Sequence, residues 1–527
     1  MRLRSLLASI CLLALPLAVA GQEAELRHDF RFMADTDPYL FLSNPAGLSA
    51  FSGHVSMAEA AFRKDNGDLA SIAESPDSFK GGAETESYIS ISDRISFHGK
   101  LSWSYFRGER MGAQVLMDPD FNHFNFLEST ETTVGRKNRE DYSLLGAMSY
   151  RFDDRWSAGA GIEYVSADQT KVKDPRFTSV WMDLGVKAGV SFRPDAGKLF
   201  GLALVSRNTL EQLRGGIYGT TDKQYFILTD KGGFYGTMAE LAGDYNYISD
   251  SNQRPLNNDF FGLSLQAVSG GFSNELEVLW RTGYYGKKSS ATATFFEFSG
   301  PVAKYRGQLL SRSGDNLHRA TVELGYELLG NDENIFKYVT PVGQNTYVDY
   351  TGKNHISDRH VADAALGYTF YKGVDSYLPA FKAGGTIKAH GLYRSTVLFP
   401  FYRNTSLVTL AADAFAQRNL EKGKSIFSFD LGMGFRAGFG EPRDDGAYAS
   451  TTGTSIQSFD NYLNRQYEFD TAPAASVGVG FGWTHRFTDR FAPYIKLTDT
   501  VTAMVSAPQY LSGRARNVAL LTIGCSF

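Results

Sequence analysis

Residues 424–439 read KSIFSFDLGMGFRAGF, and apolar and polar side chains alternate along the whole stretch. One face carries Phe427, Phe429, Leu431, Met433, Phe435, Ala437 and Phe439. The other face carries Ser428, Asp430, Gly432, Gly434, Arg436 and Gly438. Because successive side chains of a β-strand point to opposite faces, this period of two predicts a strand with one apolar face.

The same alternation recurs along most of the chain. It is found at 95–106, 142–152, 156–166, 180–193, 260–268, 317–328, 381–394 and 475–487. Many of these segments are longer than the roughly 5–6 residues of a globular strand and match the roughly 9–11 residues that cross a membrane at a tilt. Their polar faces hold Gly, Ser and isolated charges, which the packed core of a sandwich does not need. The pattern therefore favours a transmembrane antiparallel β-barrel over a soluble β-sandwich.

The connections between the predicted strands alternate in length. Short ones, several of them flanked by aromatic residues, lie at 92–94, 153–155, 194–198, 313–316, 419–423 and 488–490. Long ones lie at 64–83, 107–141, 166–179, 208–222, 330–359 and 440–473. Outer-membrane barrels have short periplasmic turns, long outer loops and interfacial aromatic girdles, so we predict an all-β barrel of about 18–20 strands. Residues 208–259 decide between these numbers, and 16 strands also remain open.

The first 20 residues have the layout of a secretory signal peptide, with a basic start, an apolar core and small residues before Gly21. We therefore expect three parts: a signal peptide at 1–20, an N-terminal segment at 21–50 and the barrel at 51–527. This organisation predicts a location in the outer membrane of a Gram-negative bacterium. The formal net charge of −4 at pH 7 argues against nucleic acid as a partner, because nucleic-acid-binding surfaces are basic.

The chain ends with ARNVALLTIGCSF, a further alternating stretch that finishes on an aromatic residue. Its apolar face, which we expect to contact outer-membrane lipid, carries Ala519, Leu521, Ile523, Cys525 and Phe527. A terminal strand of this kind resembles the signal that the barrel-assembly machinery recognises in outer-membrane proteins. The resemblance implies this machinery as a partner during biogenesis.

The stretch YLFLSNPAGLSAF at 39–51 suits neither a strand nor a helix, because Asn44-Pro45-Ala46-Gly47 interrupts it. Pro45 fixes its own φ and lacks an N–H, while Gly47 admits conformations closed to other residues. The Asn44 side chain can bond to neighbouring backbone groups. Together they predict a rigid corner. Two compatible placements remain open, a simple turn into the first strand or a segment at or in the lumen.

The layout of the mature chain resembles the large outer-membrane β-barrels of Bacteroidota, including families of unknown function. More specifically, SNPAGLS at 43–49 resembles an element near the N-terminus of the long-chain fatty-acid transporter superfamily, which also includes barrel subunits of secretion systems. That resemblance implies a barrel with an N-terminal segment inside its lumen. Members of the superfamily have 14 strands, and the higher number expected here departs from that pattern.

Three groups of charged residues share predicted inward faces. They are Lys382, Lys388, His390 and Arg394; Arg319, Glu323 and Glu327; and Glu275, Glu277 and Arg281. Such residues would line a water-filled pore and tune its selectivity, or they would form cross-strand ion pairs that fill the lumen. The presence of both signs favours the ion pairs.

The sequence contains no recognisable catalytic motif. The nine His residues are scattered, and HExxH, Gly-x-Ser-x-Gly and phosphate-binding loops are missing. The densest His group, HISDRH at 355–360, falls in a predicted outer loop, where solvation is the expected role. We therefore predict no metal, no cofactor and no enzymatic activity. Aromatic-rich loop stretches such as PDFNHFNFLEST suit contact with a glycan or a protein, or packing on one another as a lid.

Taken together, these patterns predict an integral outer-membrane channel or transporter for small solutes, hydrophobic ones included. Two other classes remain open. One is a structural or accessory barrel subunit of an uptake or secretion complex, with a protein partner that the sequence does not identify. The other is an outer-membrane enzyme with a compact site at one rim.

Overall fold

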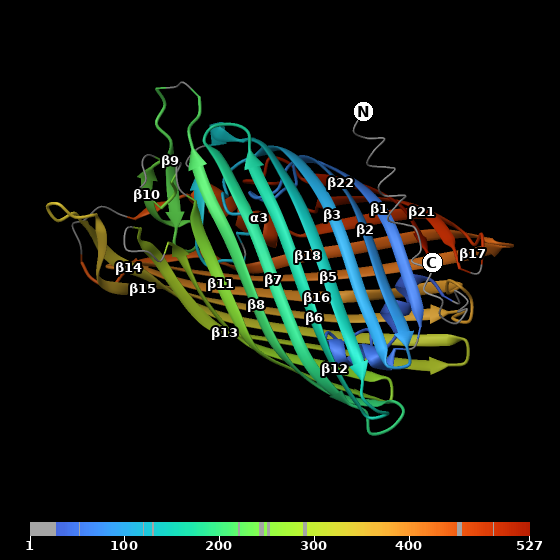
Figure 1. Cartoon of the computed structure of the whole chain (residues 1–527). Coiled ribbons are helices and arrows are strands. Elements are labelled where there is room, and N and C mark those ends of the chain that lie inside the picture. Colours follow the sequence, from blue (N-terminus) through green and yellow to red (C-terminus); the bar gives the residue numbers. More distant parts are fainter. Residues whose placement is uncertain are drawn as a thin grey trace.

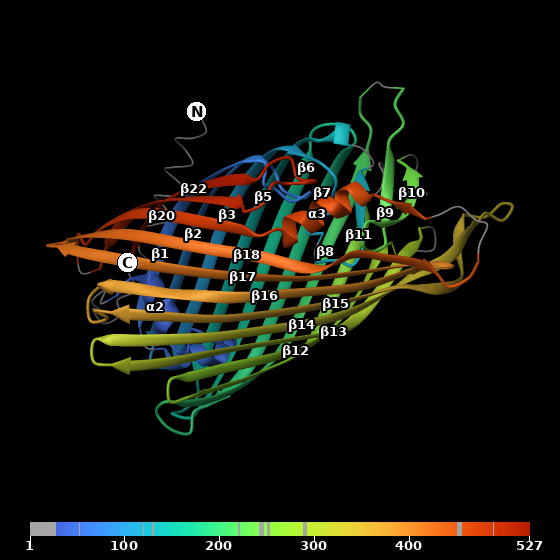
Figure 2. The same cartoon turned by 180° about the vertical axis from the view of Figure 1, so that it is seen from behind.

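Eighteen strands form one closed antiparallel barrel in the computed structural model (Figures 1 and 2). The structure describes residues 28–51, 53–119, 121–128, 131–219, 222–241, 247–249, 253–287, 292–450, 456–488 and 490–527. The predicted barrel class is confirmed, and the number of strands is the lower of the two expected. The predicted signal peptide lies outside the described residues.

Each barrel strand pairs with the next one along the chain, and the last returns to the first. The strands are β1 His54–Asn66, β2 Asp77–Ser92, β3 Ile95–Met111, β5 Gly135–Arg151, β6 Trp156–Lys171, β7 Arg176–Phe192, β8 Lys198–Gly216, β11 Arg254–Ser269, β12 Phe272–Gly286, β13 Thr294–Ser313, β14 Asn316–Val339, β15 Tyr347–Lys372, β16 Phe381–Leu398, β17 Phe401–Lys422, β18 Ser425–Ala447, β20 Ala474–His485, β21 Ala492–Met504 and β22 Ala515–Ser526. The register of β1 against β22 runs from Met57–Ser526 to Asn66–Asn517. Phe527 extends this seam, because its backbone exchanges two hydrogen bonds with Ser56.

The barrel wall is apolar outside and polar inside, as the period of two requires. On β18 the outward side chains of Phe429, Leu431 and Phe435 are about half exposed. The inward Asp430 on the same strand forms an ion pair with Lys496, with an N–O distance of 3.0 Å. A protein surrounded by water would bury such an apolar face, whereas lipid solvates it.

Polar aromatic pairs mark the two edges of the outward apolar band. At one edge His318 Nδ1 and Tyr368 Oη are 2.7 Å apart, and at the other His360 Nδ1 and Tyr326 Oη are 2.9 Å apart. Tyr368 and His360 are eight residues apart on β15, which corresponds to about 26 Å along a strand. At the strand tilt of roughly 35–45° found in transmembrane barrels, this length spans about 20 Å of height, somewhat less than their apolar band of about 25 Å.

Two connections that the sequence predicts to be long are short. β6 and β7 are joined by residues 172–175 alone, because strand pairing continues almost to the turn. Most of 330–359 is strand, because β14 and β15 pair far beyond the apolar band and project as a hairpin in both views (Figures 1 and 2). Ion pairs between Lys337 and Asp349 and between Lys353 and Asp332 accompany this extension. The HISDRH group therefore lies within β15 and not in an outer loop.

The ambiguous region 208–259 supplies no extra barrel strand. Between β8 and β11 it folds as a hairpin that joins a second, four-stranded sheet in the order β19-β10-β9-β4. The strands of this sheet are β4 Asn125–Glu128, β9 Phe226–Asp230, β10 Tyr235–Glu240 and β19 Gln457–Ser458. Diverting this hairpin from the wall explains why the barrel has 18 strands and not 20.

In the part of the chain that the structure describes, the helical elements are α2 Phe30–Thr36, the 3₁₀ elements η1 Pro45–Ala50 and η2 Glu131–Thr133, and α3 Asp460–Thr471. α3 packs against β17 and β18, where the Arg436 guanidinium lies over the Phe469 ring. Within the described residues, no helix is long and apolar enough to cross a membrane.

Candidate functional site

Residues 28–51, here called the floor segment, lie inside the barrel near the short turns. Asn44 caps η1, since its side-chain oxygen accepts a hydrogen bond from the Ala46 N–H at 3.0 Å. Pro45 occupies the first position of η1, where its missing N–H costs nothing. Pro45, Ala46, Gly47 and Leu48 are buried. The structure thus places Asn44, Pro45 and Gly47 at the wall of the lumen.

Serine and glycine residues of β5, β6 and β7 form the part of the wall against which η1 packs. Three serine hydroxyls, those of Ser149, Ser157 and Ser191, donate hydrogen bonds to the single carbonyl oxygen of Ala46 at 3.0, 3.0 and 3.3 Å. A Cβ atom on Gly159 would overlap the backbone of Pro45 and Ala46. We call this surface, completed by Gly189 opposite Asn44, the Gly-Ser seat.

Charged side chains tie the floor segment to other parts of the wall. The Ser43 N–H donates to a Glu275 carboxylate oxygen at 3.0 Å, and Lys187 Nζ donates to the Ser43 hydroxyl at 2.9 Å. In α2, Arg31 donates to both carboxylate oxygens of Glu59 at 2.7 Å. These contacts hold the segment at several points of the barrel circumference.

Asp35 in α2 reaches two of the predicted lumen-lining cations. Its carboxylate lies 3.8 Å from Arg319 and 3.9 Å from Lys382. Lys382 Nζ also lies over the rings of Tyr371 and Phe415, at 5.4 and 5.5 Å from the centroids. Arg319 and Lys382 therefore hold α2 of the floor segment to the wall through their ion contacts with Asp35.

The opposite end of the lumen is covered by residues 112–119 and 121–128, here called the roof loop. Arg281 is fully buried and donates to the Phe121 carbonyl at 2.9 Å, with its guanidinium 4.3 Å from the Phe121 ring centroid. Arg359 donates to the Asn122 carbonyl at 2.8 Å. Both arginines also bond to Glu327, at 3.0 and 2.7 Å. This arrangement clamps the tip of the roof loop to the wall.

The remainder of the roof loop is part of an internal aromatic core. Phe124 packs on Phe296 and Tyr285, with centroid distances of 4.8 and 5.4 Å, and Phe126 packs on Tyr285 at 5.2 Å. The backbone of β4 adds the loop to the second sheet through β9. Of the two roles that the sequence left open for these aromatic residues, the structure has them packed as a lid.

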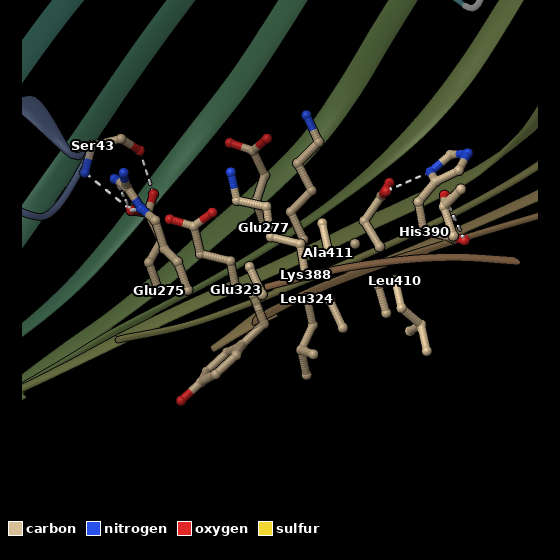
Figure 3. Close-up of a pocket in the computed structure, with 18 of the residues that line it drawn as sticks. Ser43, Glu275, Glu277, Glu323, Leu324, Lys388, His390, Leu410 and Ala411 are labelled. Atoms are coloured by element: carbon tan, nitrogen blue, oxygen red, sulfur yellow. Dashed lines mark hydrogen bonds and ion pairs between the residues drawn. The ribbon is translucent and has the colours of Figure 1, made fainter. Parts of the chain in front are cut away.

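A chamber lies between the floor segment and the roof loop (Figure 3). It comprises two adjoining pockets of about 890 and 690 Å³ that share Ser43, Glu163, Lys187, Glu277, Lys304 and Arg306 in their linings. Figure 3 shows Glu275, Glu277 and Glu323 directed to one side of the strands, and Leu324 and Leu410 to the other. Charged side chains therefore dominate the lining of the first pocket, whereas the second pocket is also lined by apolar side chains such as Phe41, Phe260 and Leu279.

The predicted lumen-lining residues divide among these parts. Lys388, His390 and Glu323 line the chamber, and His390 Nδ1 lies 2.8 Å from Asp363. Arg319 and Lys382 contact the floor segment, and Glu327 belongs to the roof clamp. Arg394 lies beside Gly232, next to the second sheet. Some of these residues thus form ion pairs, and others line the chamber.

Several chamber residues were missed by the reading of the sequence: Lys187, Lys304, Arg306, Asp363 and Glu163. Each occupies an inward position of an alternating strand, so the period of two could have identified them. On the terminal strand, Ala519, Leu521, Ile523 and Cys525 share one face, and Ile523 is about half exposed.

Within the described part of the chain, no group of three or more His, Cys, Asp or Glu side chains could hold a metal ion. In the HISDRH group, His355 instead pairs with two carboxylates, those of Asp332 at 2.9 Å and Asp358 at 3.1 Å. Two hydrogen-bonded carboxylates raise the pKa of the exposed His355 imidazole against the opposing effect of burial.

Comparison with known proteins gives a family and a few distant structures. A family model described as "Family of unknown function (DUF6850)" matches residues 45–527. No protein of curated function matches the chain.

Similar solved structures include the ferric preacinetobactin receptor BauA of Acinetobacter baumannii, at 7% identity over 90% of this chain and 80% of that chain, with a TM-score of 0.40. The outer membrane transporter YddB of Escherichia coli shares 8% identity over 89% of this chain and 80% of that chain, with a TM-score of 0.37. The ΔS2S3 mutant of the monoaromatic hydrocarbon channel TodX shares 10% identity over 92% of both chains, with a TM-score of 0.30. At these identities and TM-scores, none of them bears on what this chain does.

Proposed function

The chain belongs to the DUF6850 family of unknown function, and we propose that it is an outer-membrane β-barrel that passes small polar solutes through a gated central chamber. The observation that carries this proposal is the chamber itself: a pocket of about 890 Å³ rich in charged side chains adjoins one of about 690 Å³ that reaches both the floor segment and Phe121 of the roof loop. Pockets of roughly 300–1,000 Å³ accommodate small ligands. A barrel that served only as a scaffold would have no need of such a space.

The outward apolar band supports a location in the outer membrane. Aromatic pairs about 26 Å apart along a strand bound it, and closed pairing from β1 to β22 leaves no free edge in contact with lipid. Outer-membrane lipid and the barrel-assembly machinery are accordingly proposed as partners. The signal peptide and the Bacteroidota origin remain predictions from the sequence.

The route out of the chamber is proposed to follow the wall of β16–β21. η1 of the floor segment packs on β3 and β5–β8, away from this sector. The inward faces there carry small residues such as Gly432, Gly478 and Thr498, which line a further pocket of about 420 Å³. Asp35 in α2 contacts Lys382, which lines this pocket, so a shift of the whole floor segment, α2 included, is proposed to join the pocket to the chamber.

The charged lining of the 890 Å³ pocket favours polar solutes over the hydrophobic ones that the sequence left open. Glu163, Lys187, Glu277 and Lys304 all face the chamber. A hydrophobic solute would remove water from these charges without replacing their hydrogen bonds, which is costly. Long-chain fatty acids are therefore not among the proposed solutes, despite the resemblance of SNPAGLS to an element of the fatty-acid transporter superfamily.

An accessory role in a complex is the second candidate, and one observation favours it. The β14–β15 hairpin projects beyond the apolar band and exposes Ile335, Val342, Tyr347 and Tyr350. Exposed aromatic and aliphatic side chains on a projecting element suit contact with another protein. The proposal includes no enzymatic step.

Conductance in planar lipid bilayers tests the proposed passage. We expect the full chain to show small or rare openings, and a variant without residues 28–51 to conduct several-fold more. A variant with residues 340–346 replaced by a Gly-Ser turn, which shortens the projecting hairpin alone, should behave like the full chain. Equal, negligible conductance of all three proteins, together with a stable barrel, would favour the accessory role.

A further inference from the structure

Two transverse rows of inward residues cross the chamber wall at neighbouring levels. In the lower row Glu275, Arg306, Glu323, Ala365 and Lys388 stand directly opposite one another in the strand register, from β12 to β16. In the upper row the same holds for Glu277, Lys304, Gly325, Asp363 and His390. Residues directly opposite on antiparallel strands have Cβ atoms about 4.5–5.5 Å apart, so each row is a continuous band of side chains.

Most charges of the two rows are satisfied within the protein. Arg306 stands opposite Glu323 as well as Glu275, yet its Nε donates to Glu275 at 2.8 Å. Glu275 also accepts hydrogen bonds from Ser264 at 2.8 Å and from the Ser43 backbone. In the upper row Glu277 pairs with Lys187 at 3.1 Å.

Three charges of the two rows have no such partner among the described residues: Lys304 in the upper row, and Glu323 and Lys388, which have opposite signs, in the lower row. Among the described residues, neither Glu323 nor Lys388 has a hydrogen bond or an ion pair through its side chain. The methyl group of Ala365 is all that lies between them in the row. Since neighbouring strands are about 4.8 Å apart, the backbones that carry the two charges are separated by roughly 10 Å.

We propose that this gap is a binding site for a zwitterionic solute, such as a short peptide or a free amino acid. The ammonium group of the solute bonds to the Glu323 carboxylate, and its carboxylate bonds to the Lys388 ammonium. The inference rests on the proposed passage of polar solutes and names their class. Figure 3 shows Glu323 and Lys388 rising from the same wall of the chamber.

The pairing of charges distinguishes this solute from ions of a single sign. An anion would satisfy Lys388 and leave Glu323 unpaired, and a cation would do the reverse. A charged group that loses water without gaining a partner is penalised, whereas a zwitterion supplies a charge-assisted hydrogen bond at both ends. The chamber is large enough for more than one peptide unit, so length is not restricted by these two groups.

Equilibrium binding by isothermal titration calorimetry tests the site in the purified full chain. The probes are alanyl-alanine, its N-acetyl form, its C-terminal amide, and the form blocked at both ends. We expect alanyl-alanine to bind at least about tenfold more tightly than any blocked form, since each end contributes one charge-assisted hydrogen bond. Lys388→Met should weaken binding of the two forms with a free carboxylate and leave the amide unaffected. Glu323→Gln should weaken binding of the two forms with a free amine.

The control is Lys337→Met, which removes a lysine paired with Asp349 on the projecting hairpin, far from the chamber. Equal binding of all four probes, or no binding of any, overturns the inference, as does an unchanged pattern in both chamber variants. Uptake of a neutral sugar into proteoliposomes is measured alongside. Sugar uptake without dipeptide discrimination leaves the proposed passage standing and removes the zwitterion site. Dipeptide discrimination without any uptake supports the zwitterion site and contradicts the proposed passage.

Discussion

At the scale of single residues, glycines and serines of the wall determine where the floor segment can lie. Ser149, Ser157 and Ser191 all point their hydroxyls at Ala46, and Gly159 leaves the space that η1 occupies. An inward glycine on a barrel strand would otherwise weaken the strand. Its presence here is explained by the close approach of another backbone.

Gly159→Ala tests this fit. The added methyl group overlaps Pro45 and Ala46, and overpacking of this kind costs about 1–3 kcal/mol. Since about 1.4 kcal/mol changes an equilibrium tenfold, we expect the population with a displaced floor segment, and with it the open fraction in single-channel recordings, to rise about tenfold. Gly99→Ala is the matched control, because a Cβ there meets nothing within 4 Å. Identical recordings from the two variants would argue against the seat.

Arg281 is the residue whose loss we expect to cost the most stability. It is fully buried and joins Glu327 to the tip of the roof loop. Breaking a buried ion pair costs about 3–5 kcal/mol, so Arg281→Met should lower the free energy of unfolding in urea by an amount of that order. Arg312→Met, which removes an exposed pair with Asp375, should cost about 0–1 kcal/mol. Equal losses in the two variants would show that the clamp is not important.

Which residues face the lumen was predictable from the sequence, but their partners were not. Period-two alternation identified Lys388, Glu323 and Glu327 as inward-facing. It could not indicate that Arg306 bonds to Glu275 and leaves Glu323 free, because both carboxylates are its direct neighbours in the register. Ser43 and Lys187 contribute to that choice, because Ser43 donates a hydrogen bond to Glu275 and Lys187 donates one to Ser43. Both residues lie far from Glu275 in the sequence.

At the scale of elements, the roof loop depends on a buried histidine. His123 is completely buried beside the Phe298 ring, at a centroid distance of 4.8 Å. Burial lowers the pKa of this imidazole well below its ordinary value, the cations Arg359, Arg281 and Arg394 lower it further, and Asn331 opposes the shift. The folded roof loop therefore holds His123 neutral.

This histidine predicts a dependence of stability on pH. Unfolded, the imidazole binds a proton below a pKa of about 6.5; folded, it does so only at much lower pH, so the unfolded state holds more protons. Stability is therefore unaffected by His123 above about pH 6.5 and falls as the pH drops below it, by at most about 1.4 kcal/mol per pH unit. Urea unfolding between pH 7.5 and 5 should give a smaller fall for His123→Gln than for the unsubstituted chain. Parallel curves would contradict this account.

The elements themselves were predictable wherever alternation was continuous, and less so at their ends. The predicted segment 317–328 lies inside β14, and 424–439 lies inside β18 except for its first residue. The outer half of β15 was taken for a loop because its charged residues, among them Lys353 and Asp358, break the apolar face. Outside the apolar band a strand has no need of an apolar face, since backbone hydrogen bonds and ion pairs maintain it.

At the scale of the whole molecule, two segments distant in sequence pack against the inside of the barrel wall at two levels. The floor segment follows directly after the N-terminal residues, whereas the roof loop connects β3 and β5. The sequence predicted the barrel and a rigid corner at Asn44-Pro45-Ala46-Gly47. It left turn and lumen segment equally open, because the choice depends on serines and glycines of β5–β7 that only the folded barrel brings together.

The most direct test of the central claim is to lock the floor segment reversibly. The hydroxyls of Ser49 and Ser157 are 2.9 Å apart, so cysteines at these positions bring two thiols into contact, and we expect them to form a disulfide on oxidation. We would measure solute uptake into proteoliposomes by the Ser49→Cys/Ser157→Cys variant, in a Cys525→Ala background, before and after reduction, with Ser157→Cys alone as control. A gate at the Gly-Ser seat predicts that uptake is lost on oxidation and returns on reduction. Equal uptake by the oxidised and reduced proteins would contradict it.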